Sequence, residues 1–136
     1  MSFMSGKERK ANMEGLFRAL ADRTRLRLLN LMAEGEVCVC FFVEIIGTNQ
    51  PKISRHLAYL RRAGIVSARR DGKWMHYRIA EPRDPFAASV LADVRAWLSN
   101  DPDMQRDHKR LVKVCCSPNL PVQLQRAPRP FGSAVA

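Results

Sequence analysis

The fold of this chain is decided by residues 49–79, which read NQPKISRHLAYLRRAGIVSARRDGKWMHYRI. Thr48 or Asn49 can cap a helix whose first turn holds Pro51, because proline is favoured there. This helix is expected to stop at Gly64. Its apolar residues recur at helical spacing and would form one buried face: Ile53, Leu57 and Leu60.

A short apolar run, Phe41–Ile46, precedes this helix and is joined to it by Gly-Thr-Asn-Gln. Two short helices connected in this way, with basic and hydroxyl residues early in the second, describe a helix-turn-helix. The second helix of such a motif brings its N-terminal side chains to base edges in the major groove of DNA. The candidates are Gln50, Lys52, Ser54 and Arg55. His56 lies nearer the buried face and is expected to pack or to touch a phosphate.

Two extended runs follow, Ile65–Arg70 and Lys73–Ile79, with Asp-Gly between them. Asp-Gly in this position is a strong signal for a two-residue β-hairpin turn. A helix-turn-helix followed by a basic hairpin is a winged helix, whose hairpin lies over phosphates or in the minor groove. The cations expected to neutralise phosphates are Lys52, Arg69, Arg70 and Lys73.

The charge of the chain is concentrated in this same region. The 136 residues include 23 basic and 13 acidic side chains, a net charge of +10, and residues 51–78 alone carry eight basic and one acidic. A basic patch inside a folded segment favours a nucleic acid over a bare lipid surface, although a merely solvated surface is the alternative. Because the sequence has neither a long apolar run nor a signal peptide, we expect a cytoplasmic protein without a membrane partner.

The rest of the chain predicts further helices, so the expected fold class is mainly α with a β-hairpin wing. Amphipathic patterns occupy residues 13–21 and 23–33 before the motif, and helices can start at Asp84-Pro85 and Asp101-Pro102 after it. The first helix and the helix from Asp84 to Ser99 form the expected dimer surface. We expect one DNA-binding and dimerisation domain over residues 8–116. Residues 117–136 hold four of the eight prolines and predict a disordered tail.

The four cysteines form two close pairs, Cys38/Cys40 and Cys115/Cys116. In a cytosolic protein such pairs indicate a metal site or redox chemistry rather than disulfides. A redox enzyme is disfavoured, since the sequence has no Cys-x-x-Cys and no βαβ pattern. In an intact helix, Cys38 and Cys40 would point about 200° apart, so sharing an ion requires non-helical backbone there. Ion binding would then unwind or tilt the helix that supports the recognition helix.

Five segments in order resemble one known family. They are LADRTRLRLL at 20–29, VCVC at 37–40, NQPKISRHL at 49–57, RAGIV at 62–66 and RDGKWMHYR at 70–78. This pattern is similar to the arsenical-repressor (ArsR/SmtB) family of metal-sensing winged-helix transcriptional repressors. The resemblance implies a homodimer, paired through its N- and C-terminal helices, that binds operator DNA and leaves it when a metal or metalloid binds. Arg23 stands where the family usually has proline, and Phe41-Phe42 replaces an acidic residue and leucine.

The resemblance also implies an inducer, As(III) or Sb(III), because members with Cys-Val-Cys typically sense these ions. Such ions take three thiolates, and Val43 stands where some relatives have a third cysteine. We expect Cys38 and Cys40 to supply two sulfurs and Cys115 or Cys116, from the same or the partner chain, to supply the third. A small thiol could instead complete the site, leaving Cys115 as a buried hydrophobic residue.

Other effectors remain open. Four thiolates could hold zinc, and a divalent soft metal (Cd, Pb or Zn) or thiol oxidation could replace the metalloid. The family's Asp/His zinc site on the helix from Asp84 to Ser99 looks absent, because that helix has no histidine. His108 is isolated in the sequence and is expected to pack or to lie on the surface. No organic cofactor and no enzymatic activity are expected.

Overall fold

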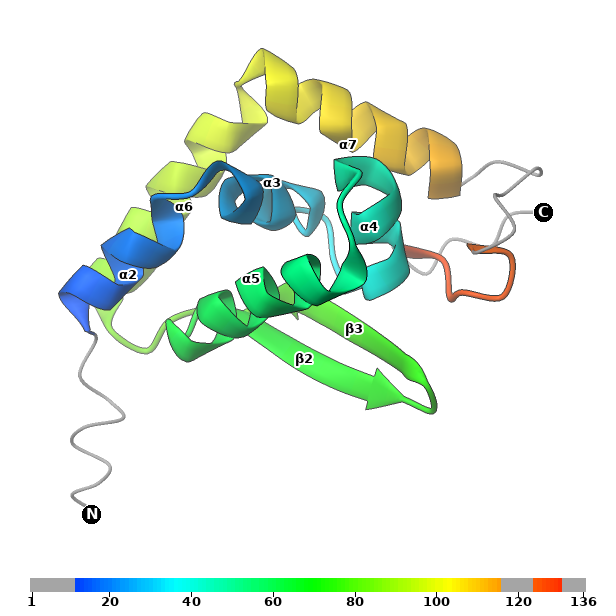
Figure 1. The fold of residues 1–136 in the computed structure, drawn as a ribbon. Helices are drawn as coiled ribbons and strands as arrows, with labels where there is room; N and C mark the ends of the chain where they lie inside the picture. The colour runs from blue at the N-terminus through cyan, green and yellow to red at the C-terminus, as the bar shows by residue number, and fades with distance from the viewer. Residues whose placement is uncertain (1–11, 116–123, 131–136) are drawn as a thin grey trace.

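The computed structural model describes residues 12–115 and 124–130. Its described part is mostly helical, with one antiparallel sheet (Figure 1), which confirms the winged-helix fold class. The helices are α2 Met13–Leu20, α3 Arg23–Leu31, α4 Val39–Ile46, α5 Gln50–Arg62, α6 Pro85–Ser99 and α7 Pro102–Cys115. The strands are β1 Val37–Cys38, β2 Val66–Asp71 and β3 Trp74–Ile79.

The helix-turn-helix consists of α4 and α5, as the sequence predicts. The turn begins at Gly47, whose φ of 81° lies in the left-handed region that glycine adopts without steric cost. Asn49 is the cap, since its side chain accepts a hydrogen bond from the Lys52 amide at 2.9 Å. The predicted apolar face of α5 is fully buried. The motif is therefore fixed to the core by one side of α5, and its other side is left exposed.

The sheet has the order β1-β3-β2, with both pairs antiparallel. Asp71 pairs with Trp74, so the hairpin loop is Gly72-Lys73 rather than the predicted Asp71-Gly72. Gly72 has a φ of 61°, which suits the tight turn. Strand β1 was not predicted: it contains only two residues and joins the sheet by pairing Cys38 with His76. The wing is thus connected directly to the residues that precede α4.

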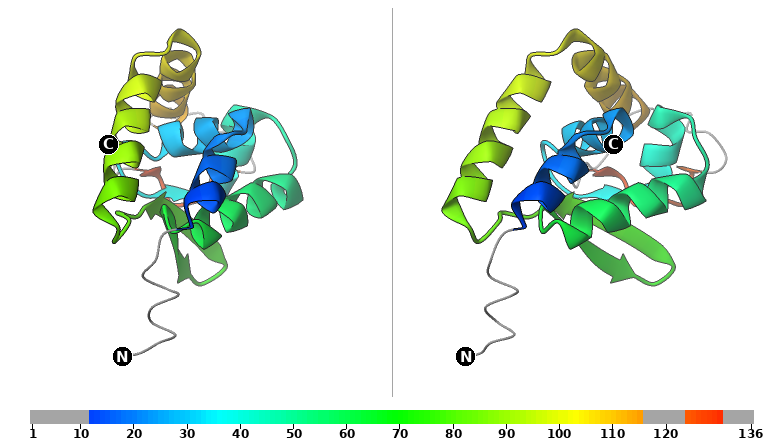
Figure 2. Two further views of the ribbon diagram at one scale, coloured as in Figure 1. Left: turned by 90° about the vertical axis from the view of Figure 1, so that its left-hand side faces the viewer. Right: turned by 60° about the vertical axis from the view of Figure 1, so that its left-hand side comes forward.

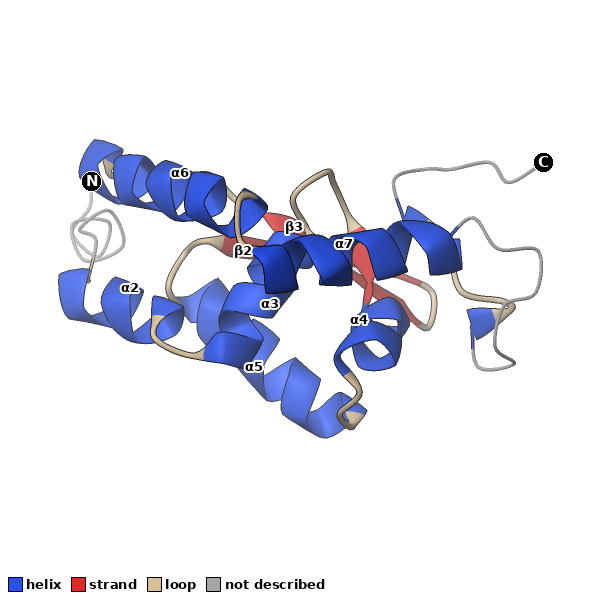
Figure 3. Ribbon diagram, turned by 90° about the horizontal axis from the view of Figure 1, so that it is seen from above, coloured by secondary structure: helices blue, strands red, loops and turns tan. Residues whose placement is uncertain are grey.

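The core is centred on α3, where Leu28, Leu29 and Leu31 are almost completely buried. Helices α5, α6 and α7 all contact α3. The wing and α7 lie at opposite ends of the molecule (Figure 2), and α2 and α6 flank the same side (Figure 3). No helix within the described ranges is both long and apolar enough to cross a membrane.

Part of the predicted tail is structured. Residues 124–130 contain a short turn, and Leu124 is completely buried in the hydrophobic core, so the prediction of disorder does not hold for these residues. Burial of this leucine removes apolar surface from water, which favours an ordered turn despite the local prolines. The other residues of the predicted tail, and Cys116 at the end of the predicted domain, lie outside the described residues.

Candidate nucleic-acid interface and thiol pair

The N-terminal half of α5 presents the predicted base-reading side chains. Gln50, Lys52 and Arg55 are exposed, and Ser54 is half-buried. Between them, Ile53 is fully buried and anchors the helix to the core. One polar face of α5 is therefore available to a major groove. The buried face on the opposite side holds the helix in this orientation.

His56 faces inward rather than toward this exposed surface. Its Nδ1 lies 3.2 Å from Nη1 of Arg25, and because a guanidinium can only donate, the imidazole nitrogen accepts. Arg25 also donates to the carbonyls of Ala19 and Arg18, each at 2.8 Å, and its guanidinium lies 4.2 Å from the ring centroid of Tyr59. Arg25 therefore ties α2 and α3 to the recognition helix. Sequence reasoning missed this arrangement, because Arg25 and its partner His56 are 31 positions apart along the chain.

The tip of the wing is basic and exposed. Arg70 donates from Nε to the Gly72 carbonyl at 3.2 Å, which holds its side chain along the hairpin. The Lys73 ammonium lies 5.2 Å from the ring centroid of Trp74, within cation–π range. Both interactions are weak enough to leave the two charges available to an external anion.

Arg69 is different, because the structure pairs it with Glu36. Its Nε donates to both carboxylate oxygens, at 3.0 and 3.3 Å, and its Nη2 donates to Oε1 at 2.7 Å. These bonds hold the pKa of Glu36 below its usual range. Glu36 was not among the predicted site residues. Its position just before the alternating Val-Cys-Val-Cys could have suggested a strand edge facing the wing.

Cys38 and Cys40 lie close together, with 3.4 Å between their sulfurs. Cys38 is extended (φ −73°, ψ 143°) and is the N-cap of α4, whereas Cys40 lies in the first turn. The sequence requirement for non-helical backbone is therefore met at Cys38 without an ion. The expected unwinding of α4 is thus not needed to bring both sulfurs together, and a tilt of α4 on binding stays a prediction.

The two thiols share a proton unequally. The Cys40 thiol donates to Cys38, and this hydrogen bond lowers the pKa of Cys38 to about 7 despite the opposing effect of burial. The same bond, together with burial, raises the pKa of Cys40. The pair thus carries one thiolate near neutral pH, and thiolates are the form that binds soft ions.

The structure does not bring the second cysteine pair to this site within the described residues. Cys115 ends α7, is 1% exposed, and its sulfur lies 3.6 Å from the Pro130 carbonyl oxygen. Cys116 lies outside the described part of the chain. In residues 12–115 and 124–130, no group of three or more His, Cys, Asp or Glu side chains is arranged to hold a metal ion.

His76 is the buried polar residue nearest to the thiol pair along the sheet. It pairs with Cys38 across β1 and β3 and is only 5% exposed. Its Nδ1 lies 3.8 Å from the Glu36 carboxylate, and its Nε2 has no hydrogen-bond partner among the described residues. His108, by contrast, is half-buried and lies 3.3 Å from Glu34, consistent with the predicted surface role.

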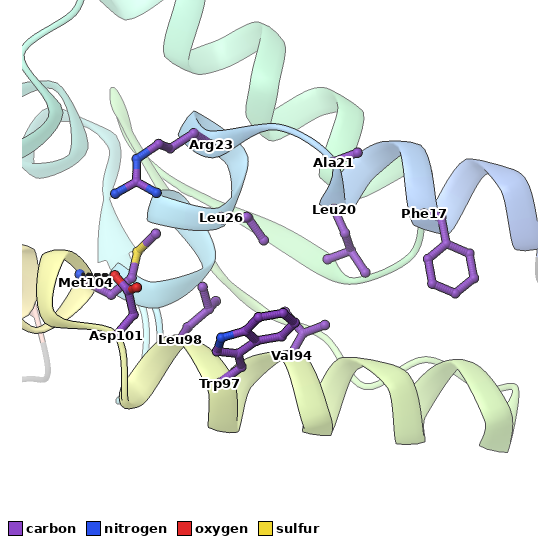
Figure 4. Close-up of a pocket in the computed structure, with 10 residues that line it drawn as sticks. All are labelled: Phe17, Leu20, Ala21, Arg23, Leu26, Val94, Trp97, Leu98, Asp101 and Met104. Atoms are coloured by element: carbon purple, nitrogen blue, oxygen red, sulfur yellow. Dashed lines mark hydrogen bonds between the residues drawn. The ribbon is translucent and has the colours of Figure 1, made fainter.

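Residues of α2, α3, α6 and α7 line a half-open apolar cavity of about 460 Å³. Leu20 and Phe17 of α2 point toward α6, and Val94 and Trp97 come from the facing helix (Figure 4). Phe17 is 52% exposed and Trp97 is 77% exposed. Large aromatic side chains left open around an apolar hollow are typical of a protein–protein contact.

Comparison with known proteins gives a consistent result. Residues 22–68 match the profile described as "Bacterial regulatory protein, arsR family". The chain is 41% identical over 103 residues to the arsenical resistance operon repressor of Escherichia coli, covering 75% of this chain and 86% of that protein. It is 45% identical over 91 residues to an arsenic resistance transcriptional regulator of Pseudomonas putida, covering 63% of this chain and 71% of the relative.

The fold also resembles a solved repressor. The crystal structure of the transcriptional repressor BigR from Xylella fastidiosa superimposes with a TM-score of 0.51 at 30% identity, covering 71% of this chain and 96% of that one. The matched region of the family profile includes α4 and α5, together with Cys38 and Cys40. The family profile therefore covers the helix-turn-helix and the Cys38–Cys40 pair, and it ends before the wing cations and the second cysteine pair.

Proposed function

Because the chain belongs to the arsR family of bacterial regulatory proteins, we propose that it is an arsenite- or antimonite-responsive transcriptional repressor. Proteins of this family are DNA-binding winged-helix repressors and not enzymes. In our proposal the chain binds operator DNA as a homodimer and leaves it when cysteine thiolates bind As(III) or Sb(III). The relatives from Escherichia coli and Pseudomonas putida are named for arsenical and arsenic resistance, which supports this choice of inducer.

The DNA-binding half of the proposal rests on α5 and the wing. Gln50 and Arg55 are exposed at the start of α5, where glutamine can pair with adenine and arginine with guanine. Lys52, Arg70 and Lys73 are exposed around them and supply sequence-independent phosphate contacts. His56 supports the helix through Arg25, and Arg69 is paired with Glu36.

The inducer-binding half rests on one observation, the 3.4 Å separation of the Cys38 and Cys40 sulfurs. Two thiolates bound to one tetrahedral ion at about 2.3 Å would lie about 3.8 Å apart, and a more pyramidal ion would bring them closer. The pair therefore needs little rearrangement to chelate a soft ion. The lowered pKa of Cys38 supplies one of the two thiolates near neutral pH.

We assign the third sulfur to Cys115 or Cys116, from the same chain or from the partner. The Cys38–Cys40 pair has only two sulfurs, and no third His, Cys, Asp or Glu side chain joins it within the described residues, so the proposal requires one of these cysteines to move to the pair. Recruiting the end of α7 would connect the helix-turn-helix to the C-terminal helix. Such a link changes the relative placement of α4 and α7, which already contact each other.

The dimer is assigned to α2 and α6. Four exposed large apolar residues support this: Met13, Phe17, Phe86 and Trp97. All of them lie on these two helices, and Phe17 and Trp97 also line the cavity. Covering them with a second copy would remove a large apolar area from water and stabilise the pair.

The test is operator release. DNase I footprinting across the promoter region of the chain's own gene should show protection that arsenite abolishes and peroxide leaves intact. Cys38→Ser and Cys40→Ser should retain the footprint but lose release by arsenite. Loss of DNA binding in both variants without arsenite, or protection that survives arsenite in the unmodified protein, would contradict the proposal.

Thiol oxidation is the second candidate. It is favoured by the same sulfur separation and by the lowered pKa of Cys38, because thiolates are the oxidisable form. In that case peroxide, and not arsenite, would remove the footprint. If the inducer is a divalent soft metal, cadmium, lead or zinc would remove the footprint in the same assay and arsenite would not.

A further inference from the structure

Glu36 holds a cation that the wing would otherwise offer to DNA. The carboxylate receives three hydrogen bonds from Arg69, one of them at 2.7 Å, and its side chain is 28% exposed. A guanidinium engaged in this two-pronged way directs at the carboxylate the same donors that bind a phosphate. Carboxylate and DNA phosphate must therefore compete for Arg69.

We propose that Glu36 is an autoinhibitory residue, which occupies Arg69 and so withholds one phosphate contact from the wing. This inference rests on the proposed DNA-binding function and goes beyond it. Arg70 and Lys73, at the tip of the same hairpin, meet only a carbonyl oxygen and an aromatic ring. Among these three wing cations, Arg69 alone is matched with a carboxylate.

The fold keeps Glu36 in position to compete. The residue directly precedes β1, whose two residues pair with β3. Arg69 and Cys38 both pair with His76 of β3, so they lie on the same face of the sheet. The carboxylate also lies 3.8 Å from Nδ1 of His76. The competitor is thus held beside the sheet by its contacts with Arg69 and His76.

The position of Glu36 also relates the wing to the thiol pair. Glu36 is two residues before Cys38, and its carboxylate lies beside His76, the residue that pairs with Cys38 in the sheet. Any shift of β1 moves the carboxylate relative to Arg69. The affinity of the wing for phosphate would therefore depend on the position of the backbone at Cys38.

The experiment measures DNA affinity against salt concentration. A fluorescein-labelled duplex of mixed sequence is titrated with the full chain, since phosphate binding is independent of sequence. Glu36→Gln should bind roughly twofold to fivefold more tightly at low salt, the range expected from removing one competing surface ion pair. The slope of log affinity against log salt should steepen by about 0.9 for each phosphate that Arg69 gains.

Glu34→Gln is the matched control. Glu34 lies two residues earlier, faces His108 rather than the wing, and its substitution changes the net charge equally. Equal affinity and slope for Glu36→Gln and Glu34→Gln would overturn the inference, because the effect would then be general electrostatics. Thermal unfolding of both variants verifies that they remain folded.

A second arm uses Arg69 itself. Arg69→Gln should change the affinity of the unmodified chain little, because Glu36 already occupies this cation, but it should abolish the gain seen in Glu36→Gln. Equal loss of affinity in both backgrounds would show that Glu36 does not compete, and would overturn the inference. Absence of any DNA binding by the unmodified chain would instead reject the proposed function.

Discussion

Cys38 and Cys40 differ in acidity because one donates its proton to the other. The hydrogen bond from Cys40 stabilises the Cys38 thiolate, and burial alone would have the opposite effect. Since the pKa of Cys38 is lower in the folded chain than in the unfolded one, ionisation of Cys38 contributes stability at alkaline pH, and the raised pKa of Cys40 opposes it in the same range. The contribution of Cys38 is lost as the pH falls through about 7.

Replacing the donor should reverse the shift. Cys40→Ala is expected to raise the pKa of Cys38 above about 7, because the side-chain hydrogen bond that lowers it most is lost while burial still raises it. The ultraviolet absorbance of the thiolate, followed during a pH titration with Cys115 and Cys116 replaced by serine, measures this change. A midpoint that stays near its original value would mean that the hydrogen bond is not the cause.

Arg55 is expected to read sequence. It is exposed in the second turn of α5, and Arg55→Ala should weaken operator binding by about 1–3 kcal/mol. Fluorescence anisotropy with the footprinted operator checks this value. A duplex of mixed sequence serves as the control and should lose much less affinity. Equal losses on both duplexes would make Arg55 a phosphate contact.

Single side chains show where sequence reasoning stops. The exposure of Gln50, Lys52 and Arg55 follows from helical periodicity and could be predicted. The pairing of Arg69 with Glu36 could not, because the two residues are 33 positions apart and meet only through the sheet. The sequence identifies Arg69 as a cation, and only the fold shows that Glu36 is its partner.

Helices α3 and α7 are joined by an ion pair between Arg27 and Asp107. Arg27 donates from Nε at 2.7 Å and from Nη2 at 3.0 Å, and Asp107 is 7% exposed. The hydrogen bond to Asp107 raises the pKa of Arg27. Two parallel bonds of this kind fix the angle between the helices as well as their distance.

Removing the carboxylate charge should loosen this connection. Asp107→Asn is expected to lower the free energy of unfolding by about 2–3 kcal/mol, since a partly buried guanidinium loses its counter-ion. Urea unfolding measures the change. Asp103→Asn is the control, because the pair between Arg23 and Asp103 is exposed, and its effect should stay within about 0.5 kcal/mol. Similar losses in the two variants would contradict this account.

At the level of elements, strong periodicity and turn residues predicted the structure well. Gly47 and Asn49 marked the two ends of the turn between α4 and α5. The turn of the hairpin was predicted one residue from its observed position. Strand β1 was missed because two residues cannot show a period, and its extended backbone is recognised as a strand through its pairing with β3. The order of residues 124–130 was missed for a similar reason, since the burial of Leu124 is a tertiary effect.

The whole molecule leaves an apolar side open along α2 and α6, where we place the dimer. Trp97→Glu should raise the dimer dissociation constant by roughly thirtyfold, the effect of losing an aromatic hot spot worth about 2 kcal/mol. Sedimentation analysis of the full chain measures this constant. The control is Val112→Glu, a substitution at a 39% exposed site on α7 that does not line the cavity. A dimer that tolerates glutamate at Trp97 would move the interface elsewhere.

Cys38 belongs to two elements at once, as the last residue of β1 and the N-cap of α4. Helix α4 leads into α5, the helix that would enter the major groove, and β1 pairs with β3, a strand of the wing. An ion bound at Cys38 would therefore act on the helix-turn-helix and on the wing at the same time. In the proposed mechanism, a single residue then connects the bound inducer to both DNA-binding elements. Substitutions around that residue would change which ion the protein detects.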